Sequence, residues 1–393
     1  MNASAQWPRE PATALIAMML LGATGSLSLG LAPLIVTALS GAGGLTPAQA
    51  GQCISAEMAG SVLGTAITIL KAQSFARRGI AIVALLIVIS ANLICIVASD
   101  FTGIITSRFI AGIGCGLTTA AYGMLASSNR PTRNFATYAV FAVLIVALCD
   151  VSIPKLIPRY GADSVFALIA FVASLSFAAS FRLANEPLSR GIQGSGFSLR
   201  GVVNRSVVAG ALMTFFYFTA LGAFWTYAAQ VGTSHGNDPA LVATTISIGF
   251  LMAGIIGSLL ATFLDGRSNA LTTIVVCTCS TALFTGAALL LPGPLIFIVA
   301  IPAFILAWFT AYPFFMGVLA DVDATGRLAM VGVLIQMSGY VIGPLLVGSF
   351  VEHGHYVRFA LTCLLGYIFT LVCVRALKLT FARPIPLSAQ RSS

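Results

Sequence analysis

Charge is what this sequence has least of. Only 8% of its 393 residues are Asp, Glu, Lys or Arg, against about 25% in an ordinary soluble domain. Apolar residues make up 58% of the chain, and the mean hydropathy is +1.00. A soluble protein of this length must cover its outside with polar groups, whereas lipid removes that requirement. The composition therefore excludes an ordinary soluble enzyme.

The motifs of several other protein classes are also missing. No Gly-rich loop ends in Gly-Lys-Ser or Gly-Lys-Thr, so ATP-driven chemistry is not supported. Cys277 and Cys279 are separated by one residue instead of the two to four usual for zinc, and Glu352 to His355 is too short to fill a coordination sphere. The net charge of +9 lies in hinges and forms no basic stripe with interleaved aromatics. We expect no metal, no cofactor, no nucleic-acid partner and no enzymatic activity.

What the sequence does contain is a repeated pattern of long apolar runs. About 20 apolar residues in a helix cross a bilayer, and a spanning backbone must satisfy its own hydrogen bonds. Barrel strands would be shorter and would alternate with polar residues. We therefore predict an all-α integral membrane protein with twelve transmembrane helices, at 12–39, 48–70, 80–98, 102–126, 135–157, 164–183, 205–232, 239–263, 271–290, 295–320, 328–351 and 357–380.

One longer basic segment divides the pattern into two sets of six. The expected organisation is an N-terminal tail at 1–11, a bundle at 12–183, a linker at 184–204, a second bundle at 205–380 and a tail at 381–393. Nearly all Lys and Arg residues fall in hinges on one side of the membrane. The positive-inside rule then places both termini in the cytoplasm of a multi-pass plasma-membrane protein, or an inner-membrane protein if the source is bacterial. A monomer is expected.

Short motifs on these spans resemble those of one protein family. Arg108 to Gly116 reads Arg-Phe-Ile-Ala-Gly-Ile-Gly-Cys-Gly, similar to an Arg-x-x-x-Gly-x-Gly-x-Gly signature on the fourth span. Phe75 to Arg78 resembles the end of that family's loop after span 2, although Gln73 replaces the usual Asp. Weaker matches occur at 264–267 and 338–344. The chain thus resembles the major facilitator superfamily over 12–380, which implies two pseudo-symmetric six-helix bundles that rock around a central site.

Three charged residues lie clearly within the spans, where each costs about 2.5–3.5 kcal/mol on insertion scales. They are Glu57, Arg108 and Asp150. Counted at 1.5 Å per residue, Arg108 and Asp150 lie at comparable depths and could pair. Our hypothesis is that Glu57 or Asp150 binds a proton, with Arg108 as its modulator or as an anchor for a substrate anion. The alternative is a static pair that fixes helix packing.

The resemblance also implies that spans 1, 4, 7 and 10 line a central cavity. Side chains with aromatic or polar groups on spans 7, 10 and 11 are the candidates for substrate contact: Trp225, Tyr227, Gln230, Trp308, Tyr312, Gln336 and Tyr340. The alternative for each ring is a position facing lipid or the membrane interface. Charged residues in the hinges form a candidate cytoplasmic gate, comprising Arg77, Arg78, Asp265, Arg267, Asp321 and Arg327.

These features predict a secondary active transporter for a small organic solute, with lipid, substrate and H⁺ as its partners. The solute would be an organic anion or an aromatic or amphipathic compound, moved by alternating access. Proton antiporters of the family usually carry Gly-Pro late in span 5, whereas this chain reads Leu148-Cys149-Asp150-Val151. That departure and Arg108 favour uptake slightly. The alternative is a proton-coupled multidrug or metabolite efflux pump of the same superfamily.

Overall fold

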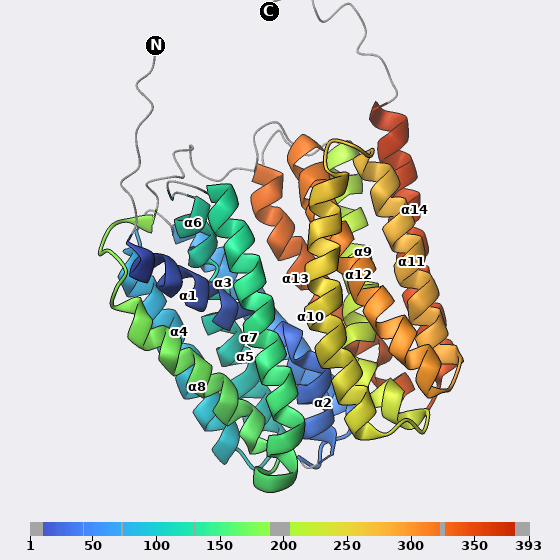
Figure 1. The fold of residues 1–393 in the computed structure, drawn as a ribbon, viewed down its shortest axis with the longest axis horizontal. Coiled ribbons are helices and arrows are strands. Elements are labelled where there is room, and N and C mark those ends of the chain that lie inside the picture. Colours follow the sequence, from blue (N-terminus) through green and yellow to red (C-terminus); the bar gives the residue numbers. More distant parts are fainter. Residues whose placement is uncertain are drawn as a thin grey trace, which may run out of the picture.

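Two groups of long helices lie side by side in the computed structural model (Figure 1). The structure describes residues 11–41, 43–71, 74–126, 128, 131–188, 205–322 and 327–381. The first group is α1 (Ala12–Gly30), α2 (Ala32–Ser40), α3 (Pro47–Lys71), α4 (Arg77–Val97), α5 (Phe101–Leu117), α6 (Ala120–Ala126), α7 (Pro131–Tyr160) and α8 (Asp163–Ser180). The second group is α9 (Arg205–Ser234), α10 (Pro239–Leu264), α11 (Ala270–Leu290), α12 (Pro294–Val322), α13 (Arg327–Glu352) and α14 (Tyr356–Phe381).

Twelve stretches of the described chain are long and apolar enough to cross a membrane. The prediction of an all-α protein with twelve membrane-spanning helices is therefore confirmed. The first predicted span is divided into α1 and α2, and the fourth into α5 and α6. Pro33 explains the first division, because proline has no N–H to donate to the carbonyl four residues earlier.

Polar residues mark where several helices begin. The Asp100 carboxylate accepts a hydrogen bond from the Gly103 amide at 3.3 Å, and Asp238 accepts one from the Leu241 amide at 3.1 Å. Asn269 similarly accepts from the Leu271 amide at 3.0 Å. Each cap satisfies a donor that has no partner within the first helical turn.

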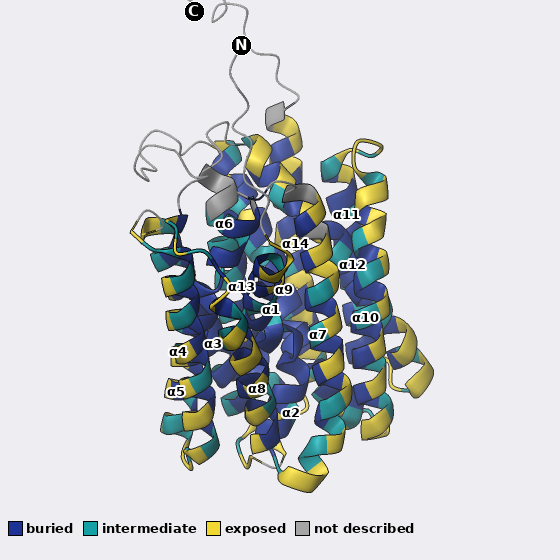
Figure 2. Ribbon diagram, turned by 60° about the vertical axis from the view of Figure 1, so that its left-hand side comes forward, coloured by how far each residue is buried: buried dark blue, intermediate teal, exposed yellow. Residues whose placement is uncertain are grey.

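The outer circumference of the molecule is apolar and exposed. Figure 2 shows exposed residues on the outward faces of the helices and buried residues where helices meet. Val97, Leu148 and Leu295 keep 79%, 68% and 72% of their surface exposed. In water this surface would promote association, whereas in lipid it is the expected exterior.

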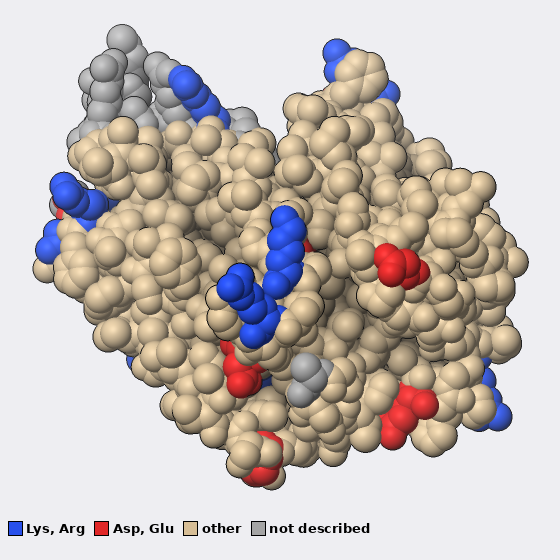
Figure 3. Space-filling model, turned by 60° about the horizontal axis from the view of Figure 1, so that its bottom comes forward, with Lys and Arg blue, Asp and Glu red and all other residues tan. Residues whose placement is uncertain are grey.

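We call the end where α1 begins and α14 finishes the terminal face, and the other end the opposite face. Seen from the opposite face, the surface carries few charged groups, scattered among uncharged ones (Figure 3). The two helix groups meet mainly through α3 against α13, α7 against α10 and α2 against α9. Because α2 joins α1 to the loop before α3, the α2–α9 contact lies toward the opposite face.

Candidate transport site

The Gly-x-Gly-x-Gly motif of α5 lets this helix pack directly on the backbone of α3. The hydroxyl of Ser61 donates to the carbonyl of Gly112 at 3.2 Å, and that of Thr65 donates to the carbonyl of Gly116 at 3.5 Å. Both contacts join residues 51 positions apart, so the two helices run parallel in a fixed register. A Cβ atom at Gly112 would collide with the backbone of Glu57. The motif therefore serves close helix packing, as small residues commonly do in membranes.

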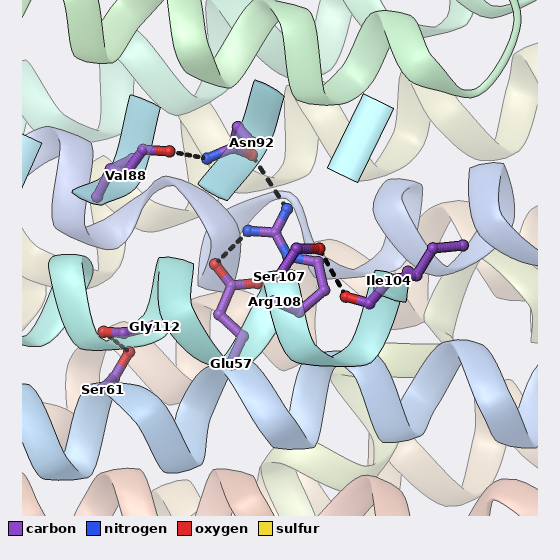
Figure 4. Close-up of polar contacts among 8 residues, drawn as sticks. All are labelled: Glu57, Ser61, Val88, Asn92, Ile104, Ser107, Arg108 and Gly112. Carbon is purple, nitrogen blue, oxygen red and sulfur yellow. Dashed lines mark hydrogen bonds and ion pairs between the residues drawn. The ribbon is translucent and has the colours of Figure 1, made fainter. Parts of the chain in front are cut away.

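This register brings Glu57 and Arg108 together, since they too are 51 positions apart. The guanidinium of Arg108 donates from Nη2 to Oε1 of Glu57 at 3.0 Å and from Nη1 to Oδ1 of Asn92 at 3.0 Å. The ring of Phe166 lies 5.0 Å from the guanidinium carbon. Both charged side chains are fully buried. Figure 4 shows the two groups pointing toward each other between α3 and α5, with Asn92 beside them.

Asn92 holds the arginine in place from the neighbouring helix. Its amide nitrogen donates to the carbonyl of Val88 one turn earlier at 2.7 Å, which turns its oxygen toward Arg108. Sequence reasoning missed Asn92 and Phe166. Both lie on predicted spans, but a neutral polar residue and a phenylalanine give no signal of their own in an apolar run.

The pairing of Arg108 with Asp150 that the depth estimate allowed does not occur. Arg108 is paired with Glu57, and within the described residues neither carboxylate oxygen of Asp150 has a hydrogen-bond partner. Depth along the membrane normal was similar, but depth does not determine the direction in which a side chain points. Asp150 is nevertheless fully buried, so the structure contains two acids in different settings.

A cluster of tyrosines lies between the two helix groups. The hydroxyls of Tyr122 on α6 and Tyr138 on α7 are 3.1 Å apart. Tyr312 on α12 lies in the neighbourhood of both, and its ring lies 6.2 Å from that of Phe218 on α9. Tyr312 still keeps 36% of its surface. Tyr122 and Tyr138 were not among the candidates from sequence.

Three of the candidate cavity residues join the two helix groups near the opposite face. The indole nitrogen of Trp225 donates to the carbonyl of Leu29 at 2.8 Å. The amide nitrogen of Gln230 donates to the hydroxyl of Ser40 at 2.5 Å. Tyr227 is fully buried and lies directly against Gly51 of α3. These contacts hold α9 against α1, α2 and α3.

The remaining candidates lie deeper in the second helix group. Trp308 packs against Trp225, with ring centroids 5.6 Å apart. Gln336 and Tyr340 are buried on α13, where the Tyr340 ring contacts that of Phe218 at 5.6 Å. The Phe218 ring thus lies between Tyr312 and Tyr340, and these three side chains form one aromatic wall.

The candidate gate residues have several different surroundings. Arg78 donates from Nε to the Leu183 carbonyl at 2.8 Å, and the amide of the buried Arg77 donates to the Glu186 carbonyl at 2.8 Å. These bonds attach the start of α4 to the segment after α8. Asp265 is exposed, and Arg267 folds back onto the Phe263 carbonyl at 2.7 Å.

Two further gate positions lie beside the gap between α12 and α13. Asp321 is exposed near the end of α12. Arg327 begins α13, but its side chain lies outside the part that the structure describes, as do Gln73 and most of the predicted linker, 189–204.

Comparisons with known proteins agree with this architecture. Residues 22–148 match the family described as sugar (and other) transporter, whereas no curated protein matches the chain. A mutant of the nucleoside transporter NupG aligns with a TM-score of 0.72 and 12% identity, over 94% of this chain and 100% of its own. The inward-open xylose transporter XylE from E. coli gives 0.70 and 13%, over 93% and 98%. A D-xylose–proton symporter gives 0.69 and 14%, over 91% and 95%.

The architecture and the matched segment agree with the fold of membrane transporters that have two helix bundles. The resemblance to the major facilitator superfamily is confirmed, and the chain has the twelve-helix fold of those secondary transporters. At 12–14% identity the solved structures share their fold with this chain and show nothing about its substrate.

Proposed function

We propose that this secondary transporter carries a neutral, hydroxyl-bearing organic solute through the space between the two bundles, coupled to protons. The observation that carries the proposal is the tyrosine cluster. Tyr122 and Tyr138 come from one bundle and Tyr312 from the other. Their hydroxyls can donate and accept hydrogen bonds, and their rings can cover an apolar or planar face of a solute. Groups from both bundles are what alternating access requires.

The state of Arg108 argues against the organic anion considered from the sequence. Its two terminal nitrogens are engaged by Glu57 and Asn92, and the side chain is fully buried. A substrate carboxylate would have to displace Glu57 and leave that acid buried without its partner, which is costly. A neutral solute is therefore favoured, in keeping with the xylose and nucleoside transporters that share the fold.

Within this proposal the candidate residues take separate roles. Tyr312, Trp308, Gln336 and Tyr340 belong to the substrate side of the second bundle, and Trp225, Tyr227 and Gln230 close the opposite face. Glu57 and Arg108 form a charge pair that fixes the α3–α5 contact. Asp150 is the acid available for proton coupling. The hinge residues Arg77, Arg78, Asp265, Arg267, Asp321 and Arg327 belong to the terminal face.

We also propose that the terminal face is cytoplasmic and that the protein is a monomer in a plasma membrane. Lys71, Arg78, Arg267, Arg375 and Lys378 belong to segments at the terminal face, whereas the opposite face has Lys155, Arg159 and Arg358. This asymmetry is the one that the positive-inside rule associates with the cytoplasm.

Transport by the purified protein in proteoliposomes tests the proposal. The probes are radiolabelled D-xylose, a radiolabelled nucleoside and, as a contrast, a radiolabelled organic anion. We expect an inward proton gradient to raise the accumulation of a neutral probe, and a protonophore to abolish it. Tyr312→Phe should raise KM, because it removes one hydroxyl from the site. Tyr160→Phe, at an exposed tyrosine of α7, is the matched control.

The result also decides between uptake and efflux. Accumulation driven by protons moving in the same direction means symport, and depletion driven by protons moving in the opposite direction means export. Accumulation of the anion alone would overturn the assignment of a neutral solute.

A further inference from the structure

The break between α1 and α2 leaves one backbone carbonyl without its usual helical partner. In a continuous helix the carbonyl of Leu29 would accept from the amide of residue 33, but residue 33 is proline. The carbonyl accepts instead from the indole N–H of Trp225 on α9, at 2.8 Å. The interruption in the first bundle thus creates the acceptor that the second bundle uses to close the opposite face.

Asp150 is on α7, which packs along α1 as far as the interruption. On α7, Tyr138 lies against Gly22 of α1, and Val146 lies against Gly30. Both contacts join positions 116 apart, so α1 and α7 run parallel in register. Asp150 is one turn beyond Val146 on the same face. Extended past the break, that register places it level with the start of α2, directly after Pro33.

The surroundings of Asp150 contain little to stabilise a negative charge. Its side chain is fully buried, and among the described residues neither carboxylate oxygen has a hydrogen-bond partner. The helices packed against α7 contribute Tyr122 of α6 and Asp163 at the exposed start of α8, whereas α1, α2 and α10 contain no Asp, Glu, Lys, Arg, His, Cys or Tyr. On α7 itself the other titratable groups are Arg133, Tyr138, Cys149, Lys155, Arg159 and Tyr160, of which Cys149 directly precedes Asp150 in the chain.

Glu57 differs from Asp150 because it has a charged partner. It has a cationic partner at 3.0 Å, in a charge-assisted hydrogen bond. An isolated buried carboxylate is far less stable than the neutral acid, so it takes up a proton instead of remaining charged.

We propose that Asp150 is the proton-binding group of this transporter, and that its protonation favours closure of the opposite face through the α1–α2 interruption and the Trp225–Leu29 hydrogen bond. The inference rests on the proposed function and identifies its coupling residue. When Asp150 loses its proton to water, a bare carboxylate lies beside the interruption. Conformations in which water reaches this charge then become favoured. To reach them, the α1–α2 segment must move away from its present packing.

The direction of the pH effect on closure follows from thermodynamic linkage. The closed state binds the proton more tightly than the open state, so low pH favours closure and rising pH favours opening. Where one proton is released per opening event, the ratio of open to closed molecules should rise by up to about tenfold per pH unit.

Two measurements on the full-length protein in lipid test this without a substrate. The first is infrared spectroscopy, in which the absorption of a protonated carboxylic acid should be lost in Asp150→Asn and retained in Asp163→Asn. The second is the distance between spin labels on Thr102→Cys and Ala240→Cys, exposed positions of the two bundles at the opposite face. Cys279→Ala and Cys373→Ala remove the native cysteines that are not buried.

The expected pattern of distances is specific. The wild type should shift toward longer distances as pH rises, whereas Asp150→Asn, a mimic of the neutral acid, should stay short at every pH. Trp225→Phe should shift to longer distances even at low pH, because it keeps an aromatic ring but loses the N–H donor. Asp163→Asn should behave as the wild type.

A pH response that persists in Asp150→Asn, or an acid absorption that persists in it, overturns the inference. Asp150→Glu is the control for misfolding. It keeps a carboxylic acid at this position and should therefore keep the pH response, with an altered midpoint. Failure of the inference is distinguishable from failure of the proposed function. If proton-driven accumulation is unchanged in Asp150→Asn, the proposed transport function stands and the assignment of Asp150 as the coupling residue is wrong. A distance that depends on pH through Asp150, with no proton-driven flux, would keep Asp150 as the pH-responsive group and overturn the proposed transport function.

Discussion

At the scale of single residues, Glu57 and Arg108 form a buried pair in which each charge is stabilised by the other. Both are fully buried, and their ion pair is 3.0 Å long. Removing one member of such a pair leaves an uncompensated buried charge and costs about 3–5 kcal/mol, whereas replacing both members by apolar residues of similar size is often neutral.

This asymmetry gives the first prediction. Glu57→Leu and Arg108→Met should each lower the thermal unfolding temperature in detergent strongly, and the double variant should recover most of the loss. Fluorescence-monitored melting of the three variants and the wild type measures the coupling between the sites. Additive losses in the double variant would mean that the two side chains act independently.

The same residues show how far a sequence can be interpreted. Hydropathy and charge identified Glu57, Arg108 and Asp150 as the residues that need partners, because an ionisable group inside a span is rare. They did not identify which residues pair, since pairing depends on the rotation of each helix about its axis. The constant offset of 51 between α3 and α5 determines that rotation, and it arises from tertiary packing.

At the scale of helices, glycine has different roles at different positions. A Cβ at Gly112 of α5 would collide with the backbone of Glu57, whereas a Cβ at Gly286 of α11 would have no heavy atom of another described element within 4 Å. Composition alone does not distinguish these two glycines. The difference comes from which face of each helix meets a neighbour.

The second prediction uses this contrast. Gly112→Ala should force α3 and α5 apart and lower the melting temperature, because backbone atoms cannot rotate out of the way as a side chain can. Gly286→Ala is the matched control and should leave the melting temperature unchanged or slightly higher, since alanine is the better helix former. Equal effects at both positions would contradict the direct packing of α5 on α3.

A third prediction concerns the interruption between α1 and α2. Pro33→Ala restores the missing amide, so the Leu29 carbonyl can be satisfied within its own helix. The Trp225 indole then competes with that amide for the carbonyl. We expect a longer distance between the spin labels at the opposite face and a red-shifted tryptophan emission. Pro313→Ala, within α12, tests whether removal of any proline has this effect.

At the scale of the whole molecule, the span count, the fold and the superfamily resemblance were all predictable, because length, hydropathy and motif order act over hundreds of residues. The boundaries of the two bundles and the cytoplasmic position of the termini stay predictions. The conformational state was not predictable. It depends on contacts such as Trp225 with Leu29 and Gln230 with Ser40, which join residues about 190 positions apart.

Closure of the opposite face must be reversible if the two bundles alternate, and a covalent bond across that face makes this testable. A Cβ built at Gly348 of α13 lies 3.4 Å from the Cβ of Ala48 on α3, close to the separation of about 3.8 Å found in disulfides. The same Cβ lies 2.8 Å from the Tyr227 hydroxyl, so the Tyr227 side chain has to turn aside. Ala48→Cys with Gly348→Cys should therefore form a disulfide under mild oxidation. Oxidation should abolish transport and a reductant should restore it, whereas each single variant should be insensitive to both reagents. Undiminished flux through fully cross-linked protein would mean that the bundles do not part at this face during transport.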